Sequence, residues 1–365
     1  MDNLTIINKI IFFIGFLIAS ISSISQGLTA YERYNGDFVV FDHGVKKTLE
    51  LQQIQRYSTG GKYIPYIDNI GYFNIYFNGK SNEIMYGPNI EFITSDNLLT
   101  YFFNDQLWVY DNGEKSLLTV WYESFKASDD IIAYLDNNTN KFMVYTSGVT
   151  HELEEVLTGV NDIDYQVGEN IVAYNFQDQF KVFINGTSYE ITFNNTPGSY
   201  KTGKNTIAYT DAQNESFHVF YKDQTYILEE FLPAWYKVAD DMVVYEDQLG
   251  VLKIFYKGEV SVLSNLDATS IKLTDNICSF IEQGVFKVFI NGNIKELEFF
   301  EPSLLIIENN VITYVDQQGQ LIQYNGISKK ILTSDLASNI SANIDVFSYV
   351  NRIGRTKIYY QGEIY

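Results

Sequence analysis

The chain has 365 residues, of which 46% are hydrophobic and 16% aromatic, and its formal net charge is −20. This charge argues against nucleic-acid binding, because neutralising phosphates requires clustered Lys and Arg. The single cysteine, Cys278, excludes a disulfide framework and Cys-rich zinc sites. With 29 Tyr and 26 Phe beside only 5 Pro, the composition favours a sheet-rich protein with an ample core.

The N-terminus has the pattern of a targeting segment. A lysine precedes an uninterrupted apolar run over residues 10–20, and small polar residues follow it. A basic start, a short apolar stretch and a small-x-small site, here Ser23 and Ser25, are typical of a secretory signal peptide. The run is short for a membrane span of about 20 residues. We therefore predict a signal peptide over 1–25, a mature repeat domain over 26–365 and no transmembrane segment in the mature chain.

One pattern then recurs about every 35 residues to the end of the chain. Its marker is an aromatic residue that closes an apolar run. Apolar or aromatic residues also recur about nine positions before the marker and about ten after it, and a glycine follows the latter. The ten markers are Tyr31, Tyr66, Tyr101, Tyr134, Tyr174, Tyr209, Tyr245, Phe280, Tyr314 and Tyr349. A near-constant period of this length indicates a solenoid, a propeller or an array.

The clearest copy, Tyr165 to Glu190, predicts the structure of the unit. It contains four short β-strand patterns, YQV, NIVAY, FKVFI and TSYEI, which we name strands A, B, C and D. An Asn-Gly or Lys-Gly pair between strands C and D is typical of a tight hairpin, which needs a positive φ. One copy has Asp223 in place of the glycine. Four sequential antiparallel strands in about 35 residues make a compact propeller blade.

In period and strand pattern the chain resembles WD40-like and TolB-like β-propeller repeat proteins, which implies an all-β ring of blades. Ten copies are compatible with one ten-bladed ring, or with two smaller rings meeting at the long spacing between Tyr134 and Tyr174. An open stack of sheets is a further alternative. The first copy lacks strand A and the last retains only a remnant of strand D. The two terminal segments could therefore pair in one composite blade and close the ring.

Acidic residues recur two positions after the marker, at the start of the loop between strands B and C. In a propeller this B–C loop shares a face with the D–A loop, so these carboxylates would form a rim for a cation or a basic partner. The alternative is structural, since Asp starts β-turns by accepting hydrogen bonds from its own backbone. Recurrence with the repeat favours the structural explanation. Apart from such a structural cation, no cofactor is expected. The residues are Asp68, Asp136, Asp211, Asp247, Glu282 and Asp316.

Two tryptophans, Trp121 and Trp235, fall just before strand A in D–A loops. Exposed aromatic side chains there can stack on sugars or anchor a protein partner. The alternative for both is packing between blades, and Trp108, within a strand C, is expected in the core.

Catalytic motifs are absent from the sequence. The three histidines, His43, His151 and His218, lie in different copies, and no G-x-S-x-G elbow, P-loop or dinucleotide fingerprint is present. We therefore expect a secreted, non-catalytic scaffold that binds a protein or a glycan, located in the periplasm, on the cell surface or outside the cell. The alternative is a hydrolase or lyase of the propeller type with an active site facing the channel.

Overall fold

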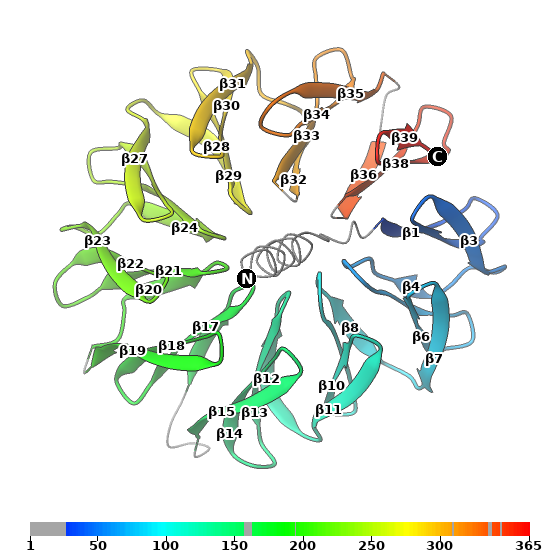
Figure 1. Cartoon of the computed structure of the whole chain (residues 1–365), viewed down its shortest axis with the longest axis horizontal. Helices are drawn as coiled ribbons and strands as arrows, with labels where there is room; N and C mark the ends of the chain where they lie inside the picture. Colours follow the sequence, from blue (N-terminus) through cyan, green and yellow to red (C-terminus); the bar gives the residue numbers. More distant parts are fainter. Residues whose placement is uncertain (1–26, 157–162, 194, 309, 335–337, 344) are drawn as a thin grey trace, which may run out of the picture.

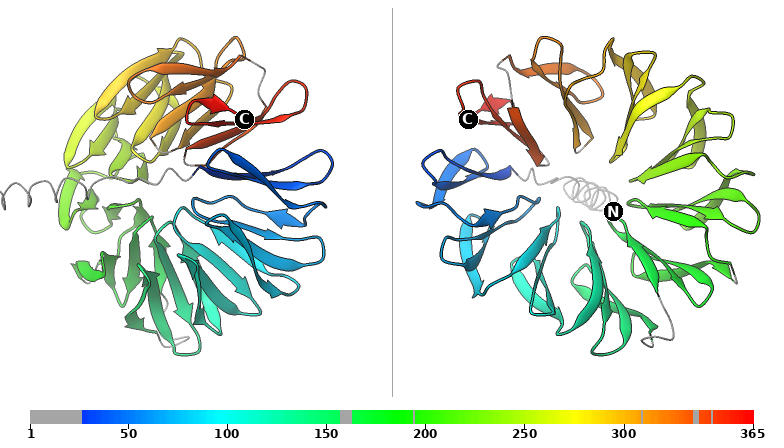
Figure 2. Two further views of the ribbon diagram at one scale, coloured as in Figure 1. Left: turned by 45° about the vertical axis from the view of Figure 1, so that its right-hand side comes forward. Right: turned by 180° about the vertical axis from the view of Figure 1, so that it is seen from behind.

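The computed structural model describes residues 27–156, 163–193, 195–308, 310–334, 338–343 and 345–365, which form ten antiparallel sheets arranged as blades of one ring (Figure 1). Nine sheets have four strands and the first has three. An oblique view and a view from behind show the blades arranged around a common axis (Figure 2). The single ten-bladed ring is thereby confirmed, whereas two smaller rings and an open stack are wrong. The described residues contain no helix.

The strands follow the chain blade by blade, in the order A-B-C-D. Blades 1–3 comprise β1 Leu28–Glu32, β2 Phe38–Asp42, β3 Val45–Glu50; β4 Arg56–Tyr57, β5 Ile64–Ile67, β6 Tyr72–Phe77, β7 Lys80–Tyr86; β8 Glu91–Thr94, β9 Leu99–Phe103, β10 Gln106–Asp111 and β11 Glu114–Thr119. Blades 4–6 comprise β12 Tyr122–Ala127, β13 Ile131–Asp136, β14 Lys141–Thr146, β15 Val149–Glu155; β16 Asp164–Val167, β17 Ile171–Phe176, β18 Gln179–Ile184, β19 Thr187–Phe193; β20 Ser199–Thr202, β21 Thr206–Asp211, β22 Ser216–Tyr221 and β23 Gln224–Glu229.

Blades 7–10 continue the same order. They comprise β24 Trp235–Ala239, β25 Met242–Glu246, β26 Leu252–Tyr256, β27 Glu259–Ser264; β28 Ala268–Thr274, β29 Ile277–Glu282, β30 Val285–Ile290, β31 Asn293–Glu298; β32 Leu305–Glu308, β33 Val311–Val315, β34 Leu321–Tyr324, β35 Lys329–Thr333; β36 Ser338–Asn343, β37 Val346–Val350, β38 Thr356–Tyr360 and β39 Glu363–Ile364. Strand D of each blade lies at the rim of the ring (Figure 1).

The C–D hairpins have the predicted turn geometry. In blade 5 both central residues, Asn185 (φ 51) and Gly186 (φ 76), adopt positive φ, as a type I′ turn requires. The copy without glycine keeps the same turn, because Lys222 (φ 49) and Asp223 (φ 63) also occupy the left-handed region. Asp enters this region more readily than most residues, so the repeat tolerates the exception.

The core lies between the blades. In the described residues there are ten apolar clusters, one at each of the ten junctions. At the junction of blades 5 and 6, the fully buried Phe180 of strand C packs on Tyr200 and Tyr209, with ring centroids 5.1 and 5.3 Å away. Burying a side chain of this size stabilises the fold by about 1.5–3 kcal/mol. Five other junctions also pair a strand C phenylalanine with the marker tyrosine.

The marker aromatic is usually tyrosine because its ring is buried while its hydroxyl reaches the preceding blade. Tyr174 donates a hydrogen bond to Glu154 Oε1 at 3.0 Å, and Lys181 Nζ lies 2.8 Å from the same oxygen. Tyr245 makes the same contact with Glu229, which also binds a lysine. The hydroxyls of Tyr174 and Tyr245 are thus satisfied across a junction, as buried hydroxyl groups require.

The ring closes differently from the composite blade considered above. The first and last blades remain separate sheets, β1-β2-β3 and β36-β37-β38-β39. The short strand D of blade 10 pairs with its own β38, and Tyr365 exchanges backbone hydrogen bonds with Ile358. Closure comes from side-by-side packing, in which Phe41 contacts Tyr360 and Tyr365 at centroid distances of 5.6 and 5.0 Å. The expectation of an exchanged strand was wrong because the tenth apolar junction joins the ends without one.

Two predictions for the chain ends have different outcomes. Among the residues that the structure describes, blade 1 has three strands and no strand A, and strand D of blade 10 is shortened to Glu363–Ile364, as predicted. The predicted signal peptide, 1–25, lies outside the described residues. Within the described part of the chain, no helix has the length and apolar character needed to span a membrane.

Candidate functional site

The six acidic residues predicted to form a rim lie in the B–C loops or at their edge, and their carboxylates are engaged there. Asp211 Oδ1 accepts hydrogen bonds from the backbone N of Gln213 (2.8 Å) and from Asn195 Nδ2 (2.9 Å), and Oδ2 accepts one from Asn214 Nδ2 (2.7 Å). Although partial burial acts in the opposite direction, these hydrogen bonds hold the pKa of Asp211 at about 2. The carboxylate therefore stabilises its own loop as an anion.

The other five residues follow the same rule. Asp68, Asp136, Asp247 and Asp316 accept backbone hydrogen bonds from residues two to four positions further on. Glu282 accepts instead from Ser264 and from Lys287 Nζ, the latter at 2.5 Å. Backbone hydrogen bonds within the loop thus support the structural explanation for the five aspartates, whereas Glu282 is held by side chains, one of them from the preceding blade. Their role in binding stays a prediction.

The two tryptophans differ in their surroundings. Trp121 is 55% exposed on the loop between blades 3 and 4. Trp235 is half-buried in the cluster between blades 7 and 8, and its Nε1 donates to Glu246 Oε2 at 3.1 Å. Trp108 is also half-buried and stacks beside Tyr101 at 6.0 Å. Packing between blades accounts for Trp235 and Trp108, whereas Trp121 presents its ring to solvent.

Exposed apolar side chains gather on the loops of this D–A/B–C face. At the junction of blades 6 and 7, Phe231, Leu232 and Leu249 are 63%, 37% and 88% exposed and line a pocket of about 310 Å³. By contrast, Ile327 is the one exposed large apolar side chain in the A–B and C–D turns that the structure describes. The exposed apolar residues of the D–A and B–C loops are Tyr34, Leu51, Ile70, Val120, Trp121, Phe231, Leu232, Leu249, Leu266, Phe299 and Ile353.

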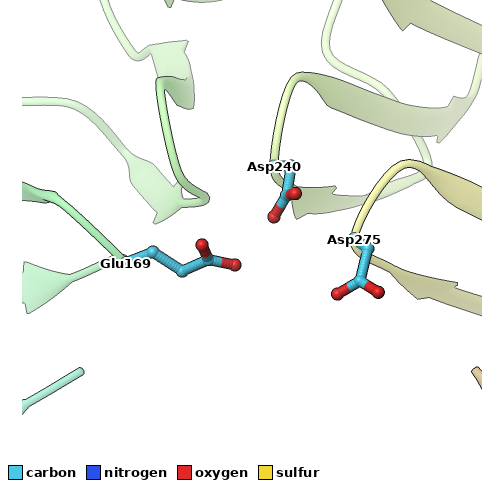
Figure 3. A group of neighbouring side chains, drawn as sticks. All are labelled: Glu169, Asp240 and Asp275. Carbon is cyan, nitrogen blue, oxygen red and sulfur yellow. The ribbon is translucent and has the colours of Figure 1, made fainter. Parts of the chain in front are cut away.

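The A–B turns on the opposite face bring a second set of acids together, and sequence reasoning missed it. The side chains of Glu169, Asp240 and Asp275 point toward one another from blades 5, 7 and 8 (Figure 3), with ligand oxygens within 4.8 Å of one another. They are the one such group in the described residues. Carboxylate oxygens are ligands that Ca²⁺ and Mg²⁺ prefer, so these three could hold such an ion.

Burial and repulsion between like charges raise pKa values in this acidic group. Burial, followed by the charges of Asp129, Glu169 and Asp275, raises the pKa of Asp96 to about 6. Burial and a hydrogen bond shared with Glu169 raise the pKa of Asp240 well above its usual range. Asp96 and Asp275 belong to blades 3 and 8, which are opposite in a ring of ten, so the acidic A–B turns converge on the axis.

Hydrogen bonds between the A–B turns of successive blades hold these turns close together. Asn170 Nδ2 donates to Asn205 Oδ1 at 3.1 Å, and Asn205 Nδ2 donates to Asp241 Oδ1 at 3.0 Å. Asn97 and Asp130 repeat the contact between blades 3 and 4. A signal was available in the sequence, since each of these turns ends in Asn or Asp and the residue before it is acidic in five copies.

The histidines do not assemble a catalytic triad in the described residues. His218 Nε2 lies 2.7 Å from Ser216 Oγ, but Ser216 is buried and His218 Nδ1 has no hydrogen-bond partner in the described part of the chain. A triad requires a carboxylate on that nitrogen and an open approach to the serine. His43 Nδ1 contacts the Asp42 carboxylate at 2.7 Å, on the far side of the ring.

The fold and its ten equivalent junctions define a β-propeller, and comparison with known families agrees. Residues 22–365 match the model of the 10-bladed beta propeller domain, so the chain belongs to that family. Similar solved structures include the computationally designed protein Ika8 (14% identity, 84% of this chain and 96% of that chain covered, TM-score 0.35). Others are Hsv2 from Kluyveromyces lactis (12%, 77% and 98%, 0.34) and the CRINKLY WD40 ectodomain of the Arabidopsis thaliana receptor kinase ACR4 (8%, 75% and 95%, 0.34). A search of curated proteins finds no match.

Proposed function

We propose that this propeller is an exported, non-catalytic scaffold that binds a protein partner through its D–A/B–C face. The observation that carries the proposal is the gathering of exposed apolar side chains on that face, against the single Ile327 in the described turns of the other. Exposed apolar side chains that cluster, as Phe231, Leu232 and Leu249 do around their shared pocket, mark interaction sites on soluble proteins. Rings of repeated blades also present loops on a rigid framework, which lowers the ordering cost of binding.

A protein fits this face better than a glycan does. Sugars stack on aromatic faces, and most of the exposed side chains here are leucine, isoleucine or valine. The pocket beside Leu249 is lined by Phe231, Leu232 and Pro233, with the Lys253–Asp247 ion pair (2.9 Å) at its edge. An apolar centre with a polar border is the usual composition of a protein interface. The net charge of −20 favours a partner with a basic border.

The decisive experiment compares two matched variants. Leu249 and Ile327 are 88% and 87% exposed and lie on opposite faces. The mature chain, its Leu249→Ser variant and its Ile327→Ser variant serve as baits for the native envelope fraction. We expect one partner to be captured by the wild type and by Ile327→Ser, with about tenfold weaker capture by Leu249→Ser, because removing a central apolar contact costs about 1–2 kcal/mol.

Two results would contradict the proposal. Equal capture by all three baits would show that the D–A/B–C face does not bind the partner. Binding to a glycan array that Leu249→Ser leaves intact would indicate that the ligand is a sugar. Turnover of ester or glycoside substrates by the mature chain would support the hydrolase or lyase alternative. Export is tested separately by N-terminal sequencing of the secreted protein, which we expect to begin at Gln26.

A further inference from the structure

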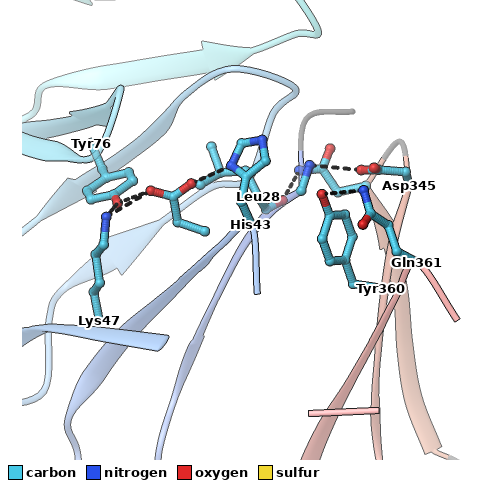
Figure 4. A network of polar contacts seen from close by, with 10 residues as sticks. Leu28, His43, Lys47, Tyr76, Asp345, Tyr360 and Gln361 are labelled. Atoms are coloured by element: carbon cyan, nitrogen blue, oxygen red, sulfur yellow. Dashed lines mark hydrogen bonds and ion pairs between the residues drawn. The ribbon is translucent and has the colours of Figure 1, made fainter. Parts of the chain in front are cut away.

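A second pocket, of about 270 Å³, lies on the A–B/C–D face among blades 1, 2 and 3. Its walls come from C–D turns of these blades and from the A–B turn of blade 2. Apolar surface is supplied by Leu28 and Phe77, and polar groups by His43, Lys62 and Asn78. Small-molecule sites have this composition, an apolar lining with a few polar groups that orient the ligand. Figure 4 shows the polar contacts beside the pocket, made by the lining residues His43 and Tyr76 and by Lys47, which lies outside the lining.

The wall contributed by blade 2 is particular to that copy. Its A–B turn occupies residues 58–63, whereas blade 3 turns within residues 95–98. The longer turn is fixed by packing, because the fully buried Tyr63 accepts a hydrogen bond from the backbone N of Asn112 in blade 3 at 2.8 Å. A Cβ on Gly60 would lie 2.6 Å from Thr94 Cβ, so the turn sits closely against its neighbour. The pocket is therefore preformed and copy-specific, unlike the repeated loop acids.

Asp42 is the one carboxylate that lines the pocket, and its negative charge is already balanced by neighbouring side chains. Asp42 is contacted by His43 Nδ1 at 2.7 Å, Lys47 Nζ at 2.9 Å and the Tyr76 hydroxyl at 2.5 Å (Figure 4). Although partial burial acts in the opposite direction, hydrogen bonds from Tyr76, His43 and Lys47 hold the pKa of Asp42 at about 2. Its charge is thus permanent and is offset by Lys47, so it does not set the charge of the pocket.

The unmatched charge is positive. Lys62 lines the pocket half-buried, and in the described residues no acidic side chain forms an ion pair with it. Blades 1 and 2 are formally neutral, because residues 27–86 contain six Lys and Arg and six Asp and Glu, whereas the whole chain has a net charge of −20. An anion approaching over these two blades therefore meets less repulsion than it would over the more acidic copies.

We propose that this pocket binds a small organic anion, whose carboxylate pairs with the Lys62 ammonium and whose apolar or aromatic body lies against Leu28 and Phe77. The amide of Asn78, at the pocket border, can donate a hydrogen bond to the same carboxylate. The site faces away from the apolar D–A/B–C loops, so its ligand and the protein partner proposed above are tested independently.

Benzoate is a suitable probe because it joins one carboxylate to an apolar ring. Calorimetric titration of the mature chain should show benzoate binding, with about tenfold weaker binding of benzyl alcohol, which lacks the charge, and of inorganic phosphate, which lacks the ring. Lys62→Met should weaken benzoate binding about tenfold and leave thermal stability unchanged. Lys80→Met is the matched control, since Lys80 lies in the same C–D hairpin as Asn78 but does not line the pocket.

Absence of benzoate binding to the wild type would overturn the proposal. So would equal affinity for benzoate and benzyl alcohol, or an affinity that Lys62→Met does not lower. Phosphate binding as strongly as benzoate would show that the charge alone is recognised and would overturn the assigned ligand class. Increasing salt should weaken benzoate binding to the wild type and have little effect on Lys62→Met, because screening acts on the ion pair.

Discussion

The B–C loops and the A–B turns use carboxylates in opposite ways. Beside the B–C loop of blade 6, Asp211 is surrounded by hydrogen-bond donors of that loop and of the preceding D–A loop, and its pKa is about 2. On the A–B side, burial and neighbouring acids raise the pKa of Asp96 to about 6. Both are acidic residues next to strand B of a blade. The comparison teaches that a repeated residue type acquires its properties from how closely the ring brings its copies together.

Distance from the axis is the physical cause of the difference. The B–C loops that carry an aspartate at this position supply their own backbone N–H groups to its carboxylate, so these carboxylates are stabilised locally. The A–B turns converge instead, and a charge in blade 3 is influenced by charges in blades 5 and 8. Burial at this crowded place weakens solvation of the charged form, and like charges add to the effect.

The largest effect on stability is expected when a side chain is added to a glycine in the crowded A–B turns. A Cβ on Gly203, in the A–B turn of blade 6, would overlap the carbonyl oxygen of Ala239 in the next blade. Because backbone must move to accommodate it, Gly203→Ala should lower the free energy of unfolding by about 3 kcal/mol or more. Urea denaturation of the mature chain measures the change.

The matched control is Gly250 in the B–C loop of blade 7. It has a positive φ (78°), and a Cβ there would meet nothing within 4 Å. Gly250→Ala should therefore cost only the strain of a left-handed alanine, about 1–2 kcal/mol. Equal costs at the two positions would contradict the difference in crowding between the faces.

The next effect is the pH dependence of stability, whose sign is opposite for the A–B turn acids and for Asp211 beside a B–C loop. Asp96 and Asp240 have pKa values above those of the unfolded chain, so the folded state retains protons that the unfolded state has released. Their contribution is most favourable below about pH 4 and is lost as the pH rises through their folded-state pKa values. The Asp96→Asn, Asp240→Asn double variant should thus be more stable than the wild type by about 1–2 kcal/mol at pH 9, after allowance for solvent screening.

Asp211 supplies the comparison. Its pKa is lower in the folded state, so it stabilises the protein above about pH 4 and loses that effect as the pH falls toward 2. Asp211→Asn should lower the free energy of unfolding at pH 7 by about 1–2 kcal/mol, because its charged hydrogen bonds are weakened. Thermal melts across pH 3 to 9 report both trends. A gain of stability in both variants at pH 9 would refute the assignment of opposite roles.

The sequence predicted the blade and its turns well, because both depend on local patterns. Strand order, the positive φ at Gly186 and the missing first strand all follow from alternation and turn residues within one repeat. Closure without strand exchange and the convergence of Glu169, Asp240 and Asp275 did not follow. They depend on the number and inclination of the blades, which bring residues of distant copies together and leave little trace in any one copy.

The two tryptophans show that the sequence also did not predict which side chains would be exposed at one position of the repeat. Replacing the exposed one has the smallest expected effect on stability. Trp121 and Trp235 were equivalent in sequence, but Trp235 packs in a junction and donates to Glu246, whereas Trp121 is 55% exposed. Trp121→Ala should change the free energy of unfolding by no more than about 0.5 kcal/mol. Its effect should appear instead as weaker capture of the partner, since exposed tryptophans are frequent binding hot spots.

Trp235→Ala should behave in the reverse manner. It removes a half-buried ring and leaves Glu246 without its donor, which should lower the free energy of unfolding by about 2–3 kcal/mol. Denaturation and partner capture measured on the same two variants separate the roles. Loss of stability in Trp121→Ala, or unchanged capture by it, would show that the exposed ring belongs to the framework, and the binding surface would then have to be sought among the leucine-bearing loops of blades 6 and 7.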